Sequence, residues 1–248
     1  MRRVMRSVLT GLAVASVVFL AGCSADGFAM SGVADVEGVT QSEAEQMSTQ
    51  ERFERFGKQY ATLQGIMTEA QLQVSDGTWE WGDAGFIGAP GTFARYPLQG
   101  ANDNPQNSYF LRTSRYLFPE SAAGASADLQ PMIDYFEEQK WEYTLDDSRT
   151  SYYAAVADTG DGYFVEYTVQ ANGQCNLEVF SAAFWGEHDD VSERIAPRTS
   201  VKDQLKESVP GVYVPFPEWD GPILSKTDYG TWVDVESGAE EPTADPAE

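Results

Sequence analysis

Tyr163 to Val179 reads YFVEYTVQANGQCNLEV and contains two alternating segments on either side of Asn172-Gly173. In the first segment, every second residue is apolar or aromatic: Tyr163, Val165, Tyr167 and Val169. In the second segment, the same spacing holds for Cys175, Leu177 and Val179. Alternation over this length is typical of strands with one buried face. The stretch therefore predicts an antiparallel hairpin with one apolar face.

The length of the loop decides which residues face each other across this hairpin. A two-residue Asn172-Gly173 turn would place Val169 opposite Asn176, so that apolar and polar side chains would share a face. A three-residue loop, 171–173, places Val169 opposite Cys175 and keeps the apolar face continuous. It also puts Gly173 at the third position, which takes the left-handed conformation that glycine adopts without strain. The further predicted pairs are Tyr167 with Leu177 and Val165 with Val179. We therefore predict a three-residue loop with a G1 bulge, and a buried Cys175.

Similar patterns extend the sheet beyond the hairpin. Strands are predicted at 78–81, 108–118, 141–145 and 151–157. The glycine-rich stretch 82–91 is predicted to be irregular, and a short helix is predicted at 200–207. The segment 210–219 is rich in proline and aromatic residues, so we expect it to run extended along a domain edge.

Two longer helices are also predicted. Ser48, followed three residues later by Glu51, is a capping-box signature. Apolar residues then recur at steps of three and four until the helix ends near Val74: Phe53, Phe56, Tyr60, Leu63 and Met67. In the second helix Pro131 fits only the first turn, which favours Asp128 over Ser126 as the N-cap. Its predicted apolar face consists of Leu129, Met132, Ile133 and Phe136.

Together these elements predict an α+β fold, with an antiparallel meander sheet of about four to six strands and two helices packed on one face.

The N-terminus has the layout of a lipoprotein leader. Arg2, Arg3 and Arg6 precede an uncharged, mostly apolar segment from Val8 to Phe19. This segment is shorter than the roughly 20 residues that span a bilayer. Leu20-Ala21-Gly22-Cys23 then resembles the bacterial lipobox. That resemblance implies cleavage before Cys23 and attachment of diacylglycerol to its thiol, with acyl chains such as palmitate inserted in the membrane.

The leader sets the predicted domain organisation. Residues 1–22 form the signal peptide, and 23–41 form the lipidated cysteine and a flexible tether with a reach on the order of 25 Å. Residues 42–235 form a single globular domain, and 236–248 form an acidic disordered tail. If Cys23 carries lipid, Cys175 is the second of two cysteines and has no partner for an intramolecular disulfide.

The chain is strongly acidic. Its formal net charge of −23 includes three leader arginines, so the mature chain carries about −26. Such a charge disfavours nucleic acid and anionic lipid as partners. It suits solubility, or alternatively a cation-rich or basic partner.

Three motifs lie in this part of the chain: Trp79-Glu80-Trp81 before a Gly/Pro loop, Phe136 to Trp141 at a helix-to-strand junction, and Asp161-Gly162-Tyr163 opening the hairpin. They are similar to motifs of uncharacterised actinobacterial lipoproteins of the LppA-like kind. The resemblance covers roughly residues 50–185. It implies a location and an α+β shape, but no reaction. Such lipoproteins often carry a further cysteine pair, of which this chain keeps only Cys175.

Three groups of residues suggest further chemistry. Glu187-His188-Asp189-Asp190 contains the single histidine and could bind a cation, or form a solvated acidic loop. Asp146-Asp147 and Asp158 with Asp161 suggest either paired carboxylates for glycoside hydrolysis or turns. The third group consists of aromatic residues that either line a groove for glycan or peptide, or fill the core: Trp79, Trp81, Trp185, Tyr213, Phe216 and Trp219.

No catalytic motif, cofactor signature or metal-ligand spacing stands out, and we predict no catalytic, cofactor-binding or metal residue. Cys23 is the one predicted functional residue, as the lipidation site through which the membrane is a partner. We expect a lipid-anchored protein on the extracytoplasmic face of the cell membrane. It is expected to be a non-catalytic binding or envelope-maintenance module whose partner is a protein, peptide or glycan. The alternatives are an envelope hydrolase with paired carboxylates and a solute-binding lipoprotein.

Overall fold

The predicted hairpin forms strands β6 (Tyr163–Gln170) and β7 (Cys175–Ser181) in a computed structural model. That structure describes residues 32–82, 88–91, 94–98, 104, 106–149, 152–199 and 206–224. Val169 lies opposite Cys175, as predicted, and the two further predicted pairs are also present. The alternation of apolar residues therefore fixes the register, because a shift by one residue would turn every apolar side chain to the other face.

The loop of this hairpin has the predicted three-residue form. The amide of Gln170 donates to the carbonyl of Gln174 (2.9 Å), and the amide of Gly173 donates to the carbonyl of Gln170 (2.9 Å). Gly173 has a φ of 84°, the left-handed conformation expected of a G1 bulge. Cys175, at the start of β7, is 1% exposed, so its predicted burial is also confirmed.

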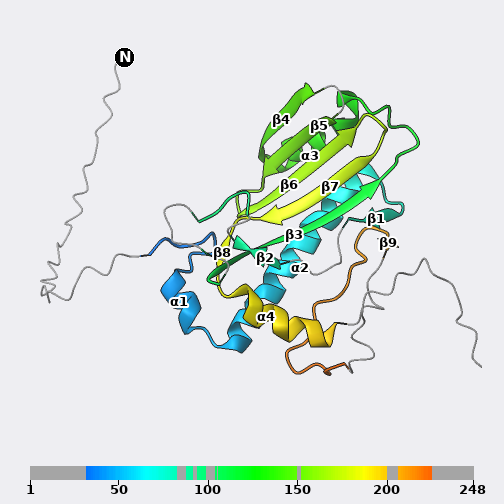
Figure 1. Ribbon diagram of the computed structural model, residues 1–248. Helices are drawn as coiled ribbons and strands as arrows, with labels where there is room; N and C mark the ends of the chain where they lie inside the picture. The colour runs from blue at the N-terminus through cyan, green and yellow to red at the C-terminus, as the bar shows by residue number, and fades with distance from the viewer. Residues whose placement is uncertain are drawn as a thin grey trace, which may run out of the picture. The chain divides into compact units, whose positions relative to one another are not determined.

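The hairpin lies inside an antiparallel sheet that is larger than predicted. Nine strands of the described residues join in the order β4-β5-β6-β7-β3-β1-β9, and β2 and β8 also pair with β3 (Figure 1). The other strands are β1 (Trp79–Trp81), β2 (Gly88–Pro90), β3 (Ser108–Leu117), β4 (Glu142–Arg149), β5 (Tyr152–Asp158), β8 (Phe184–Trp185) and β9 (Glu207–Ser208). The α+β class is confirmed, while the estimate of four to six strands is too low.

Three short strands were missed, and one of them, β8, follows the hairpin where no strand was predicted. β2 falls in the stretch 82–91 that was predicted to be irregular, and it pairs with Tyr109 to Leu111 of β3. Lys206 lies in a bend and Glu207 belongs to β9 rather than to the end of a helix, while residues 200–205 of that predicted helix lie outside the described residues. All three strands are two or three residues long. Tertiary pairing, rather than local alternation, creates them.

The helices are α1 (Gln41–Gln46), α2 (Thr49–Val74), α3 (Gln130–Gln139) and α4 (His188–Ile195). α2 packs against β3, β6 and β7, while α3 packs beside it on β5, so the two predicted helices cover one face of the sheet (Figure 1). α2 has the predicted capping box of Ser48 and Glu51 and ends at Val74. No described helix is both long and apolar enough to cross a bilayer.

The prediction of Asp128 as an N-cap is wrong. A 3-10 turn, Ser126–Leu129, precedes α3, and Asp128 is the third residue of that turn. Its carboxylate accepts a hydrogen bond from the amide of Ala125 at 3.1 Å, so it caps the turn from inside. Pro131 lies in the first turn of α3, as predicted.

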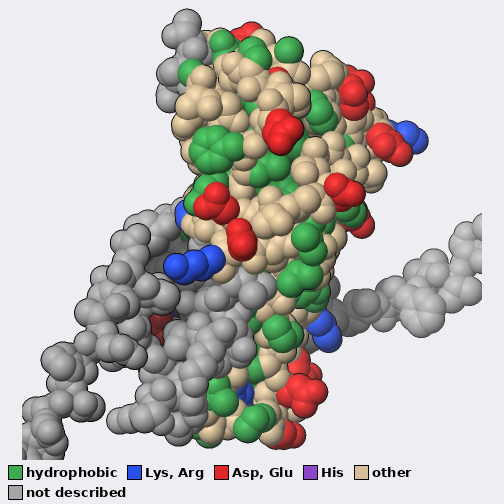
Figure 2. All heavy atoms as spheres, turned by 90° about the vertical axis from the view of Figure 1, so that its right-hand side faces the viewer, with side chains coloured by type: hydrophobic (Ala, Val, Ile, Leu, Met, Phe, Trp, Pro, Cys, Tyr) green, Lys and Arg blue, Asp and Glu red, His purple; other side chains and the backbone are tan. Residues whose placement is uncertain are grey.

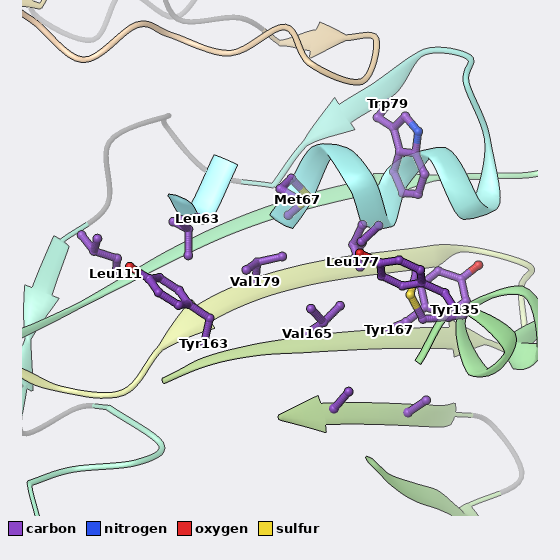
Figure 3. Packing of buried hydrophobic residues seen from close by; sticks show 14 of the residues in the cluster. Leu63, Met67, Trp79, Leu111, Tyr135, Tyr163, Val165, Tyr167, Leu177 and Val179 are labelled. Atoms are coloured by element: carbon purple, nitrogen blue, oxygen red, sulfur yellow. The ribbon is translucent and has the colours of Figure 1, made fainter. Parts of the chain in front are cut away.

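The main core lies between α2 and the sheet. All five residues of the predicted α2 face are buried. Figure 3 shows Leu63 and Met67 on α2 above Val165 and Val179 of the hairpin. The apolar face of the hairpin is therefore covered by the apolar face of the first long helix, and this contact organises the core.

Replacing Leu63 by Ala is expected to lower the free energy of unfolding by about 3 kcal/mol, because the side chain is 1% exposed and its removal leaves a cavity. Leu72→Ala in the same helix is the matched control. Leu72 is 53% exposed, so its replacement should change the stability by less than about 0.5 kcal/mol. Urea unfolding followed by tryptophan fluorescence measures both. Equal losses of stability in the two variants would contradict the packing of Leu63 in the core.

Candidate functional site

The predicted lipidation site, Cys23, and the leader lie outside the described residues, as does the acidic tail 236–248. The first residue that the structure describes is Gly32, nine residues after Cys23. The prediction of a flexible tether up to residue 41 is wrong for its second half. Residues 33–40, here called the strap, fold against the domain and lead directly into α1.

Asp35 organises the strap. One of its carboxylate oxygens, Oδ1, accepts hydrogen bonds from the amides of Glu37 (3.0 Å) and Val39 (3.1 Å) and so closes a turn. The other oxygen, Oδ2, accepts from Nη2 of Arg55 (2.6 Å) and from the amide of Trp185 (3.1 Å). The Asp35 side chain is completely buried, so its charge is stabilised by four donors instead of water.

Arg55 joins the strap to the rest of the domain. This residue of α2 binds Asp35, donates from Nε to Glu37 (2.6 Å) and donates from Nη1 to the carbonyl of Trp185 (2.8 Å). The indole of Trp185 in turn donates to the carbonyl of Val33 (2.7 Å). Three segments that are distant in sequence therefore meet at one guanidinium, whose planar set of donors suits several acceptors at once.

A second layer of hydrogen bonds supports this ion pair. Gln59, one turn after Arg55, donates to Glu37 (3.0 Å) and accepts from the hydroxyl of Tyr109 (2.7 Å). Burial is the main cause that raises the pKa of Tyr109, so the hydroxyl keeps its proton and acts as a donor. The geometry of this network is that of a structural clamp.

Three of the tryptophans suggested for a groove are in the interior instead. Trp79, Trp81 and Trp185 are buried. The guanidinium of Arg115 lies 3.6 Å from the ring centroid of Trp81, and the Trp81 indole donates to Ser208 (2.7 Å). The alternative that these aromatics fill the core is therefore correct for all three, because the sheet is wider than predicted.

Two of the three remaining aromatics border a shallow groove, whereas Tyr213 packs on Tyr60 with ring centroids 6.1 Å apart. Phe216 and Trp219 belong to the predicted extended segment 210–219 and pack on Phe53 of α2, with ring centroids 4.9 and 5.4 Å away. The groove has a volume of about 470 Å³ and carries charged groups at its rim. Its full lining is Phe53, Glu54, Gly57, Lys58, Ala61, Phe216, Pro217, Glu218 and Trp219. This combination of aromatic floor and charged rim is suited to a peptide or glycan.

Gly57 allows Phe216 to approach the helix. A Cβ atom added at Gly57 would lie 2.8 Å from the Phe216 ring, closer than real contacts permit. Glycine within a helix lowers stability by about 1 kcal/mol relative to alanine, so we expect a close contact to explain the glycine at position 57. Contact with the Phe216 ring supplies that reason and fixes one wall of the groove.

His188 does not belong to an acidic loop. Residues 188–190 form the first turn of α4, with Glu187 as the N-cap residue. Nδ1 of His188 lies 3.0 Å from Asp189, and Nε2 lies 3.1 Å from the Ser192 hydroxyl. Asp190 instead binds Arg52 of α2 at 2.7 Å. The helix thus separates the four residues, and no group of three metal-competent side chains occurs in the described part of the chain.

The carboxylates suggested for hydrolysis have local structural contacts. Asp158 accepts from the amide of Gly160 (2.8 Å) in the predicted turn, and no side-chain contact joins it to Asp161 in the described structure. Asp146 and Asp147 lie in β4 at a register shift rather than in a separate turn. Asp146 accepts from the hydroxyl of Ser148 (2.6 Å). These contacts are typical of Asp as a backbone-stabilising residue.

One pair of facing carboxylates was missed. Glu166 on β6 lies directly opposite Glu178 on β7, away from the helices. Glu166 is bound by Arg95 (2.5 Å) and by the Tyr152 hydroxyl (3.2 Å). Both of these neighbours donate to the Glu166 carboxylate. We read its role as fixing Arg95 against the sheet, where the guanidinium also lies 4.7 Å from the Phe180 ring centroid.

Cys175 lacks the setting of a nucleophile. Burial is the main cause that raises the pKa of its thiol, which disfavours the reactive thiolate. Its side chain belongs to the main core.

Comparison of the chain with protein-family models, curated proteins and solved structures finds no match. The similarity to LppA-like lipoproteins therefore stays a prediction.

Replacing Asp35 by Ala is expected to lower the free energy of unfolding by about 2–4 kcal/mol, because the Arg55 guanidinium then loses its buried carboxylate partner. Asp161→Ala is the control, since Asp161 is an exposed carboxylate for which the structure shows no side-chain ion pair. Chemical denaturation compares the two. A loss at Asp35 no larger than the loss at Asp161 would contradict the clamp.

Gly57→Ala and Gly65→Ala form a matched pair within α2. A Cβ at Gly65 meets nothing within 4 Å, so alanine should stabilise the protein by about 0.5–1 kcal/mol through helix propensity. At Gly57 the same change forces the Phe216 ring to move and should instead destabilise by about 1–3 kcal/mol. Thermal unfolding of both variants measures these changes in stability. Stabilisation by both substitutions would argue against close packing of Phe216 on Gly57.

Proposed function

We propose that this protein is a lipid-anchored, extracytoplasmic binding module held on the cell membrane through Cys23. The observation that carries the proposal is the motif Leu20-Ala21-Gly22-Cys23 at the end of a basic-then-apolar leader. Two acyl chains on one cysteine supply durable attachment, at about 0.8 kcal/mol per buried CH₂ group. The anchoring does not require a membrane-spanning helix.

The folded part of the chain is compatible with this arrangement. The strap begins within ten residues of Cys23 and is fastened by Arg55, so tension along the chain would be borne by a buried ion pair instead of by the sheet edge. A domain that is attached at one terminus benefits from such a junction, because the first described residues are tied to the core.

The groove formed by Phe53, Phe216 and Trp219 is the proposed ligand site. Its apolar floor would bind an aliphatic or aromatic group, or the apolar face of a sugar, and its rim would select polar substituents. The face of the molecule on the side of β1 and β9 shows acidic side chains spread more widely than basic ones (Figure 2). The surface therefore suits neutral or basic partners better than nucleic acid.

The anchoring is tested by replacing Cys23 with Ala in the producing cell. The protein should move from the membrane fraction to the soluble fraction, and metabolic labelling with a palmitate analogue should disappear. Cys175→Ala is the control, because it removes the other thiol and should leave both readouts unchanged. Membrane retention and labelling of the Cys23 variant would disprove lipidation at this residue.

A further inference from the structure

The strap is fastened to one end of the sheet. Val36 packs against the turn between β5 and β6, where a Cβ added to Gly162 would lie 2.5 Å from its side chain. The turn between β6 and β7, residues 171–173, lies at the opposite end of β6. α2 runs along the sheet between the two ends, with Arg55 in its first half and Val74 at its far end (Figure 1).

We infer that the end of the sheet with the β5–β6 turn faces the bilayer, and that the end with the β6–β7 turn is presented away from it. This inference rests on the proposed anchoring of Cys23. It assigns a membrane-facing surface, made of the strap, the start of α1 and the β5–β6 turn.

Chain length limits how far this surface can lie from the lipid. Nine peptide units join Cys23 to Gly32, and a fully extended chain of nine residues spans at most about 30 Å. Each strand residue adds about 3.3 Å, so the eight-residue strand β6 places its two ends roughly 25 Å apart. The strap holds Gly32 at one of these ends. A tether of this length therefore keeps the two ends at different average distances from the membrane.

Charge determines whether the domain lies on the lipid or stands away from it. The exposed groups of the membrane-facing surface are mostly carboxylates: Glu37, Glu43, Glu45, Asp158 and Asp161. The nearby Arg55 is engaged by Asp35 and Glu37. Anionic head groups repel such a surface, since attraction to them requires clustered Lys and Arg. The domain therefore stands on its tether rather than adhering to the leaflet.

The burial of Cys175 makes this orientation measurable. With Cys23 acylated and Cys175 buried, a single added cysteine is the one accessible thiol in the described part of the chain. Asp161→Cys labels the β5–β6 turn, and Ala171→Cys labels the β6–β7 turn. Both positions are exposed. Each lipidated protein, carrying a maleimide donor dye, is incorporated into phosphatidylcholine vesicles that contain a rhodamine-labelled lipid.

Energy transfer to the lipid from position 161 should be at least about twice that from position 171, because the two positions lie at opposite ends of β6. Asp35→Asn in each labelled protein removes the charge that holds the strap. Release of the strap would extend the flexible tether from Gly32 to Gln41. The ratio of energy transfer from position 161 to that from position 171 should therefore fall toward one. Addition of anionic lipid should not raise transfer from position 161.

Equal transfer from the two positions, or higher transfer from 171, would overturn the orientation. A ratio that Asp35→Asn leaves unchanged would show that the strap does not set it. These outcomes differ from failure of the anchoring itself. In that case, the protein purified from cells would not float with the vesicles and would carry no acyl chain by mass spectrometry.

Discussion

The contact between the apolar face of the β6–β7 hairpin and the apolar face of α2 is the constraint on which the other parts of the structure depend. Val165, Leu177 and Val179 must all point to the same side for this face to exist, and the three-residue loop is what places them there. α2 then has one sheet surface on which to bury its own stripe. β3, β5 and α3 extend that core outward, and the helix provides the position from which Arg55 reaches the strap.

Elements whose signals are local could be predicted from the sequence. The capping box of Ser48, the alternation of the hairpin and the position of Gly173 each depend on residues a few positions apart, so the sequence contains the complete signal. β2, β8 and β9 were missed because they are too short to alternate and exist through pairing with β3 and β1. α4 was missed since its first turn consists of charged residues, whose apolar face is limited to Val191 and Ile195.

The candidate sites were harder to predict, for a related reason. The strap looks polar and small in sequence, which is the composition of a linker, yet Asp35 is its decisive residue and its partner Arg55 is 20 positions away. Nothing local distinguishes a carboxylate that will be buried by a distant guanidinium from one that stays in water. Both interpretations of the aromatics, groove or core, stayed open in the sequence because their burial depends on the width of the sheet. A sheet of nine strands has room for Trp79, Trp81 and Trp185 that a narrower one would lack.

The Asp35–Arg55 pair is better understood as a positioning device than as a source of stability. Desolvation of two charges costs several kcal/mol and offsets most of their attraction, so a well-packed apolar pair could often replace them at little cost in stability. An apolar pair could not, however, reproduce the directions of the bonds. Asp35 accepts from its own turn, from Arg55 and from the amide of Trp185, and these requirements can be met together in one arrangement of the strap. The network therefore specifies where the chain leaves the domain. Under the proposed anchoring through Cys23, that exit point would determine which surface is held near the membrane and which surface remains available to a partner.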